Sequence, residues 1–131
     1  MRVYKLRDFA RRAAKAGVSD ADLREAVQRA ERGQIDGRIG KFLIKQRIAR
    51  ENQDRAKGFR TIIVYKVGNM AVFMHVFPKN RQANLTDKEE QTYRLAAKTV
   101  AGLRDGFITA LVRDGEWIEV DDDHDQQELP E

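Results

Sequence analysis

The feature that most constrains the fold of this chain is a pair of strand-like runs separated by two turn residues. Residues 61–67 read TIIVYKV and are dense in the β-branched residues that favour strands. Residues 70–77 read MAVFMHVF, and Pro78 follows them and ends the run because proline cannot donate a ladder hydrogen bond. Gly68 and Asn69 between the runs are typical of a two-residue hairpin turn. The sequence therefore predicts a β-hairpin at the centre of a sheet.

Two short helices are predicted before the hairpin. Apolar residues recur at helical spacing in residues 6–16 and again in residues 23–30. Gly17 and Gly33 are natural helix ends, and Ser19 is a suitable N-cap for the second helix. The two helices form a helical hairpin, and five arginines are expected on its outer face: Arg11, Arg12, Arg24, Arg29 and Arg32.

Weaker patterns predict the remaining elements. Alternation of apolar and polar residues predicts a strand over residues 43–50, whereas three glycines favour a loop over residues 33–40. Thr86 and Glu89 form a capping box that opens another helix, which is expected to run to about Arg104. Three short elements complete the set: a strand at residues 3–5, a helix at residues 107–113 and a strand at residues 117–120.

These elements follow the order β-α-α-β-β-β-α, with an additional helix and strand at the C-terminal end. The predicted fold class is α+β, with a small antiparallel sheet, an N-terminal helical hairpin and the helices gathered on one face of the sheet. Residues 1–120 are expected to form a single domain, and residues 121–131 an acidic C-terminal tail.

The charge of the chain is distributed unevenly. The net charge is +4, but residues 116–131 carry eight acidic residues and no Lys or Arg, and removing that −8 leaves +12 on residues 1–115. A body this basic attracts polyanions, chiefly nucleic acid. The chain has no cysteine for disulfides or thiolate metal sites, and no apolar run long enough to span a membrane. We expect a cytoplasmic protein that does not bind a membrane.

Basic side chains gather around the strands. Lys45 and Arg47 share one face of their predicted strand, and Arg60 opens the next strand. A solvated outer face explains Lys45 and Arg47 taken alone, but like charges this close repel one another unless an anion lies nearby. Together with Lys79 and Arg81, which follow the hairpin, these cations would form a phosphate-binding surface.

Such a surface is suited to cleaving RNA without a metal or cofactor. A 2′-hydroxyl would attack the adjacent phosphate, cations would stabilise the extra charge, and a lysine with a lowered pKa would take the proton. Lys45 is the candidate for this base. His75 is more simply explained as a hydrogen-bonded sheet residue. His124 lies in an acidic, tail-like segment that supplies no fixed metal geometry.

Three runs carry a resemblance to a known family: residues 43–50 (LIKQRIAR), 58–61 (GFRT) and 77–84 (FPKNRQAN). Together with residues 4–11 and 17–20, they resemble the RelE/ParE toxin superfamily, over about residues 1–120. The likeness is to the phage- and plasmid-associated RelE-type toxins that have a longer C-terminal extension. It implies the toxin of a toxin–antitoxin pair, bound tightly by its antitoxin in a hetero-oligomer. It also implies cleavage of mRNA, typically on the ribosome, without metal or cofactor.

The resemblance also implies site residues. The catalytic set is Lys45, Arg47, Arg60 and Lys79. The RNA-binding set is Arg50, Asn80 and Arg81. Well-studied members place a catalytic tyrosine shortly after the last basic pair, whereas this chain has no aromatic residue there until Tyr93. Two other functions therefore stay open, a ParE-like inhibitor of DNA gyrase and a plain RNA-binding or adaptor module. The acidic tail either solubilises the protein or folds back over the basic surface.

Overall fold

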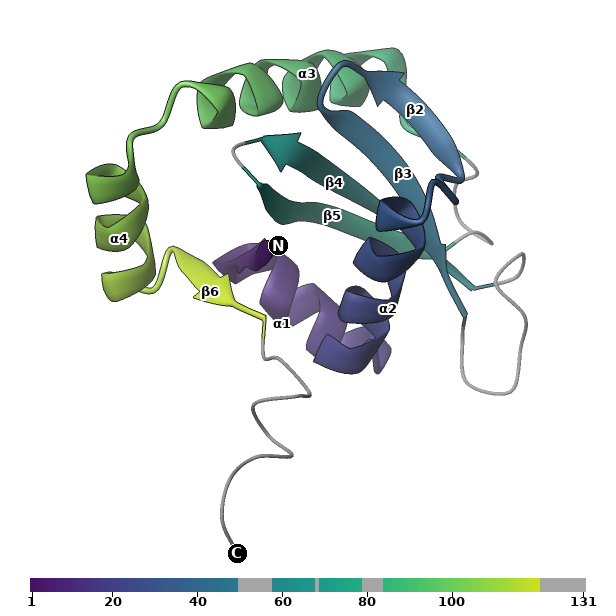
Figure 1. Ribbon diagram of the computed structural model, residues 1–131. Helices are drawn as coiled ribbons and strands as arrows, with labels where there is room; N and C mark the ends of the chain where they lie inside the picture. The colour runs from purple at the N-terminus through teal and green to yellow at the C-terminus, as the bar shows by residue number, and fades with distance from the viewer. Residues whose placement is uncertain (50–57, 68, 79–83, 121–131) are drawn as a thin grey trace, which may run out of the picture.

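The computed structural model describes residues 1–49, 58–67, 69–78 and 84–120 (Figure 1). Within these residues the elements follow the order β1 (Arg2–Leu6), α1 (Arg7–Ala16), α2 (Asp20–Glu31), β2 (Gly37–Gly40), β3 (Leu43–Ile48), β4 (Phe59–Val67), β5 (Met70–Pro78), α3 (Asp87–Ala101), α4 (Asp105–Arg113) and β6 (Trp117–Glu119). The predicted α+β class is confirmed, and the observed order of the elements agrees with the predicted one apart from one additional strand, β2. Among the described residues, no helix is both long enough and apolar enough to cross a membrane.

The strands form one mixed sheet in the order β2-β3-β4-β5-β1-β6. Two details differ from the sequence prediction. The segment expected to be a loop contains β2, which pairs with β3 at the edge of the sheet, where short glycine-containing strands are tolerated. The pairing of β1 with β5 is parallel, so the sheet is not wholly antiparallel. The pairing of β1 with β5 joins distant segments, which local alternation cannot predict. Strand β2 pairs with the adjacent β3, and it was missed because its glycines favour a loop.

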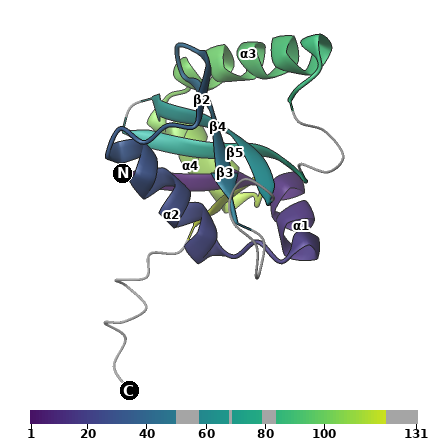
Figure 2. The same cartoon turned by 90° about the vertical axis from the view of Figure 1, so that its right-hand side faces the viewer.

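Helices cover both faces of the sheet, and the expectation that they gather on one face is wrong. Helices α1 and α2 lie on one face and α3 on the other (Figures 1 and 2). The reason lies in the central strands, where successive residues are all buried. Ile62, Ile63 and Val64 are each 0% exposed, although they point alternately to opposite faces. A strand that is apolar on both faces needs a covering layer on each side.

The predicted helix boundaries are confirmed where a local cap defines them. Gly17 ends α1 in the left-handed conformation, with φ 77°. Ser19 caps α2 through a capping box, and the predicted box of Thr86 and Glu89 opens α3. Helix α3 ends at Ala101, earlier than expected, and α4 begins soon afterwards.

The hairpin of β4 and β5 turns where the sequence predicts it. Val67 pairs with Met70, and Asn69 takes the positive φ of 59° that tight hairpin turns require. Farther along, Ile62 pairs with His75 while Ile63 pairs with Phe73, which leaves Met74 in a β-bulge. After this bulge, His75 and Phe77 lie on the same face of the sheet as α3.

Candidate functional site

Three basic side chains lie together on the face of the sheet that α3 covers. Arg47 of β3 pairs directly with Arg60 of β4, and Lys45 lies two residues from Arg47, opposite Ile62. We call Lys45, Arg47 and Arg60 the cationic patch. Arg47 is exposed and Arg60 is buried, with 6% of its surface accessible. The sequence-based prediction that these three cations converge is therefore confirmed by the strand register.

A buried glutamine on the opposite face fixes β3. The side chain of Gln46 donates to the carbonyls of Ala26 (2.9 Å) and Gln34 (3.2 Å). Its oxygen accepts a hydrogen bond from the backbone N–H of Asp36 (2.7 Å). The hydroxyl of Thr61 donates to the backbone carbonyl of Gln46 (2.9 Å). Because every polar atom of this buried amide side chain is used, the position of β3 against α2 and β4 is tightly defined.

The backbone of Arg47 is held at both ends by Asp36 and Arg29. Its N–H donates to Oδ2 of Asp36 at 2.8 Å, and its carbonyl accepts from the guanidinium of Arg29. Arg29 also pairs with Asp36 (3.1 Å) and Glu25 (2.9 Å). Arg29 is only 4% exposed, so the expectation that it lies on the outer face of the helical hairpin is wrong. The two carboxylates offset the cost of removing the guanidinium charge from water, because a buried charge needs paired partners.

The environment of the patch lowers the pKa of two of its side chains. The pKa of Lys45 is lowered by partial burial first, then by Arg60 and Arg47, against a smaller opposing effect of Asp36. The pKa of Arg60 is lowered by burial and by Arg47, although a guanidinium still keeps its proton at neutral pH. Lys45 is therefore the member of the patch that can lose a proton most readily. Its Nζ donates to Oδ1 of Asn84 at 2.6 Å.

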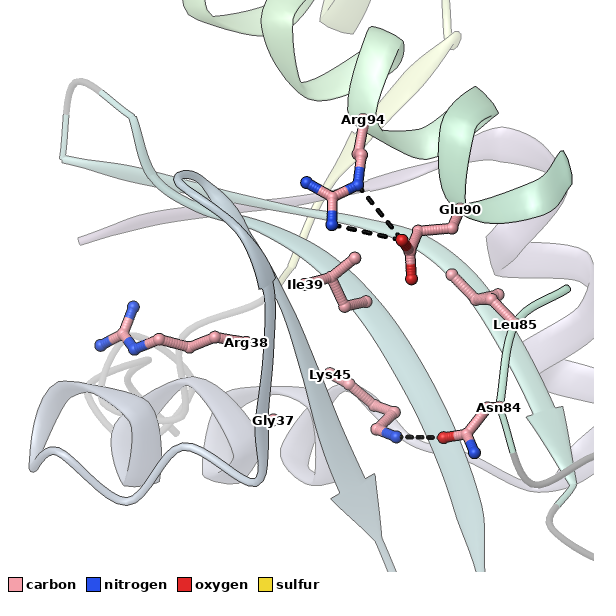
Figure 3. Close-up of a pocket in the computed structure, with 8 residues that line it drawn as sticks. All are labelled: Gly37, Arg38, Ile39, Lys45, Asn84, Leu85, Glu90 and Arg94. Carbon is pink, nitrogen blue, oxygen red and sulfur yellow. Dashed lines mark hydrogen bonds and ion pairs between the residues drawn. The ribbon is translucent and has the colours of Figure 1, made fainter. Parts of the chain in front are cut away.

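A pocket of about 240 Å³ opens beside Lys45 (Figure 3). It lies between β2, β3 and the start of α3, and its wall includes residues 37–39, Lys45, Asn84, Leu85, Glu90 and Arg94. Gly37 makes room for the lysine, because a Cβ at this position would lie 3.2 Å from Cε of Lys45. The guanidinium of Arg94 bonds to Oε2 of Glu90 at 3.2 Å. The pocket is thus continuous with the cationic patch.

Aromatic rings border the same face on its other side. Ile62 pairs with both Lys45 and His75, so these three residues form one row across β3, β4 and β5. The ring of His75 stacks on that of Tyr93 in α3, with 5.4 Å between the ring centroids, and its centroid lies 5.5 Å from that of Phe77. Burial lowers the pKa of His75 and favours its neutral form. These ring contacts place His75 in the packing between β5 and α3, whereas the hydrogen bond expected for this sheet residue stays a prediction.

Part of the predicted site lies outside the described residues. The structure brings Lys45, Arg47 and Arg60 together. The positions it does not describe are Arg50, Lys79, Asn80 and Arg81. All the catalytic and RNA-binding assignments stay predictions.

Asn84, Glu90 and Arg94 were not predicted from the sequence. Glu90 and Arg94 have the i, i+4 spacing of a helical ion pair, but that pattern alone gives no sign that β2 lies alongside.

One comparison with known proteins gives a match. The family model described as RelE toxin of the RelE/RelB toxin–antitoxin system matches residues 1–120. No curated protein and no solved structure matches the chain.

Proposed function

Since the chain belongs to the RelE toxin family of the RelE/RelB toxin–antitoxin system, we propose that it is an endoribonuclease that cleaves ribosome-bound mRNA without a metal. A toxin of this system has an antitoxin as its partner, and cleavage of mRNA would inhibit translation. We propose further that residues 1–120 act as one toxin domain, with residues 121–131 as an acidic tail.

The observation that carries the proposal is the environment of Lys45. A lysine with its ordinary pKa is protonated at neutral pH and cannot accept a proton. Burial and the two neighbouring arginines lower the pKa of Lys45, which raises the fraction of its neutral amine. The same arginines lie where an RNA phosphate next to Lys45 would need charge stabilisation.

The reaction that suits these groups is an in-line transesterification within the RNA. The neutral amine of Lys45 takes the proton of a 2′-hydroxyl, and the bond between O2′ and phosphorus forms. Arg47 and Arg60 stabilise the negative charge on the five-coordinate phosphorus. The bond between phosphorus and O5′ then breaks, and Lys79 is the candidate donor that protonates O5′. The products are a 2′,3′-cyclic phosphate and a 5′-hydroxyl.

A pair of variants tests the proposal. Lys45→Met keeps the aliphatic stem and removes the amine, so mRNA cleavage should fall at least about 100-fold, which is the usual contribution of a general base. Lys45→Ala combined with Arg60→Ala should abolish growth arrest on inducible expression. Primer extension maps new mRNA 5′ ends in the same cells. Lys15→Met, an exposed lysine of α1, is the matched control and should remain toxic.

The folded state of each variant is checked by circular dichroism and by its capacity to bind the antitoxin. A double variant that remains fully toxic contradicts the proposal. Growth arrest with loss of DNA supercoiling and no new mRNA ends would instead identify the protein as a gyrase inhibitor.

A further inference from the structure

The pocket beside Lys45 has a polar end on each side of two apolar walls. Lys45 and Asn84 lie at one end, and Glu90 and Arg94 at the other (Figure 3). Ile39 of β2 and Leu85 face each other between them (Figure 3). Both are partly buried and pack against the core cluster under α3, which holds the two walls in place.

This arrangement has room for the base of one nucleotide. A flat base can insert between Ile39 and Leu85, because every base has apolar faces. Its sugar and phosphate would then lie at the end of the pocket that carries Lys45, next to the cationic patch. The volume of about 240 Å³ is smaller than the roughly 300–1,000 Å³ of pockets that hold drug-sized ligands, so the pocket suits a single base.

Arg38 does not add a further cation to the interior. It belongs to the pocket wall, but its guanidinium points away from Lys45 (Figure 3). Its strand partner Ile44 lies in the core cluster under α1 and α2, on the opposite face of the sheet. The groups that meet the base are therefore the two apolar walls and the Glu90 end.

The Glu90 end is where one base can be distinguished from another. Both hydrogen bonds from Arg94 reach Oε2 of Glu90, and the other carboxylate oxygen points towards the space between Ile39 and Leu85 (Figure 3). A carboxylate only accepts hydrogen bonds, so it favours a base edge that presents donors. Guanine presents two adjacent donors, its N1–H and its 2-amino group. In cytosine and adenine the amino donor adjoins a ring-nitrogen acceptor, and in uracil the imino donor lies between two carbonyls.

We propose that this pocket is a base-recognition subsite that selects guanine next to the phosphate bound by the cationic patch. The inference rests on the proposed function, because it takes RNA to be the substrate. Glu90 is a specificity residue that touches the base, whereas Arg94 is a positioning residue that orients the Glu90 carboxylate.

The test measures binding of the full chain to 2′-O-methyl RNA pentamers of sequence UUXUU, which cannot be cleaved at the methylated riboses. Fluorescence anisotropy gives the affinity for X as G, A, C or U. The wild-type protein should bind the G pentamer about tenfold more tightly than the U pentamer, which is near the low end of the discrimination that a full bidentate pair provides, because a single Glu90 oxygen faces the base.

Three variants separate the roles of the residues. Glu90→Gln should reduce the preference for guanine to less than about twofold, because an amide no longer presents only acceptors. Arg94→Gln keeps the Glu90 carboxylate but removes the guanidinium that orients it, so it should reduce the preference less than Glu90→Gln does. Lys45→Met should weaken binding of all four RNAs by a similar factor. Glu31→Gln, at an exposed position of α2, is the control for loss of an acidic residue and should behave as wild type.

The outcomes distinguish the subsite from the proposed function. Equal binding of all four RNAs, still dependent on Lys45, would overturn the guanine subsite and leave the ribonuclease proposal standing. A Glu90→Gln variant that keeps the full preference would also overturn it. A wild-type protein that neither binds these RNAs nor cleaves mRNA would overturn both proposals.

Discussion

Replacing Gln46 with leucine tests whether the cationic patch depends on the opposite face of β3. Gln46 is 0% exposed, and its side chain makes three hydrogen bonds, to Ala26, Gln34 and Asp36. Leucine has a similar size but makes none of these bonds. Because the backbone N–H of Asp36 loses its acceptor, the segment that leads into β2 should also become less ordered.

The expected loss of stability follows from these bonds. A hydrogen bond contributes about 0.5–1.5 kcal/mol net, so the three bonds together stabilise the fold by about 3 kcal/mol. The added apolar surface of leucine offsets about 1 kcal/mol of this through its burial. We therefore expect the free energy of unfolding to fall by about 2 kcal/mol, the balance of these two effects.

Urea unfolding, followed by the fluorescence of Trp117, measures this change. The control is Gln28→Leu at an exposed position of α2, where the free energy of unfolding should change by less than about 0.5 kcal/mol. mRNA cleavage should also decrease in Gln46→Leu under conditions where the variant is fully folded, because Asp36 positions Arg47. The reasoning is refuted if Gln46→Leu has the same unfolding midpoint as the wild-type protein.

Three further perturbations have defined outcomes. The cleavage rate should increase with pH until Lys45 has lost its proton. Arg47→Gln removes a cation that lowers the pKa of Lys45, so the pH–rate profile of this variant should shift to higher pH, and a shift to lower pH would contradict the role of Lys45 as the base. Trp117→Ala should lower the free energy of unfolding by about 3–5 kcal/mol in a thermal or urea titration, because this 6%-exposed ring packs in the core. Hydrogen bonds from Arg47 and Arg29 hold the pKa of Asp36 below its ordinary value despite burial, so the stability that Asp36 contributes is present above the unfolded pKa of 3.8 and is lost as pH falls through the folded value. Arg29→Met should reduce this loss of stability in acid, measured by thermal unfolding at a series of pH values.

The sequence predicts the elements that short-range interactions define. Gly17 ends a helix because it adopts a left-handed conformation, and Thr86 opens one because its hydroxyl caps the N–H of Glu89 three residues later. Lys45 and Arg47 share a face because side chains alternate along any strand. Each of these predictions depends on residues within a few positions of one another, and each is confirmed.

Two features that the sequence did not predict depend on partners outside the element that carries them. The burial of Arg29 depends on Asp36 and on the backbone of Arg47, neither of which belongs to α2. The pocket beside Lys45 depends on Asn84, which lies 39 positions farther along the chain. Helical or strand periodicity contains no information about such contacts, so both the buried arginine and the pocket had to come from the tertiary structure.

The position of β1 has a consequence for how the molecule folds. This strand comes from the start of the sequence, yet it lies between β5 and β6, and its pairs include Arg2 with Met70 and Leu6 with Trp117. During synthesis at about 5–20 residues per second, β1 therefore emerges several seconds before either neighbour exists. Contacts this far apart in sequence slow folding, because a long loop must close before they form. The complete sheet should consequently form late, after the chain has been synthesised through residue 119, and β1 and β6 should be among the last strands to pair.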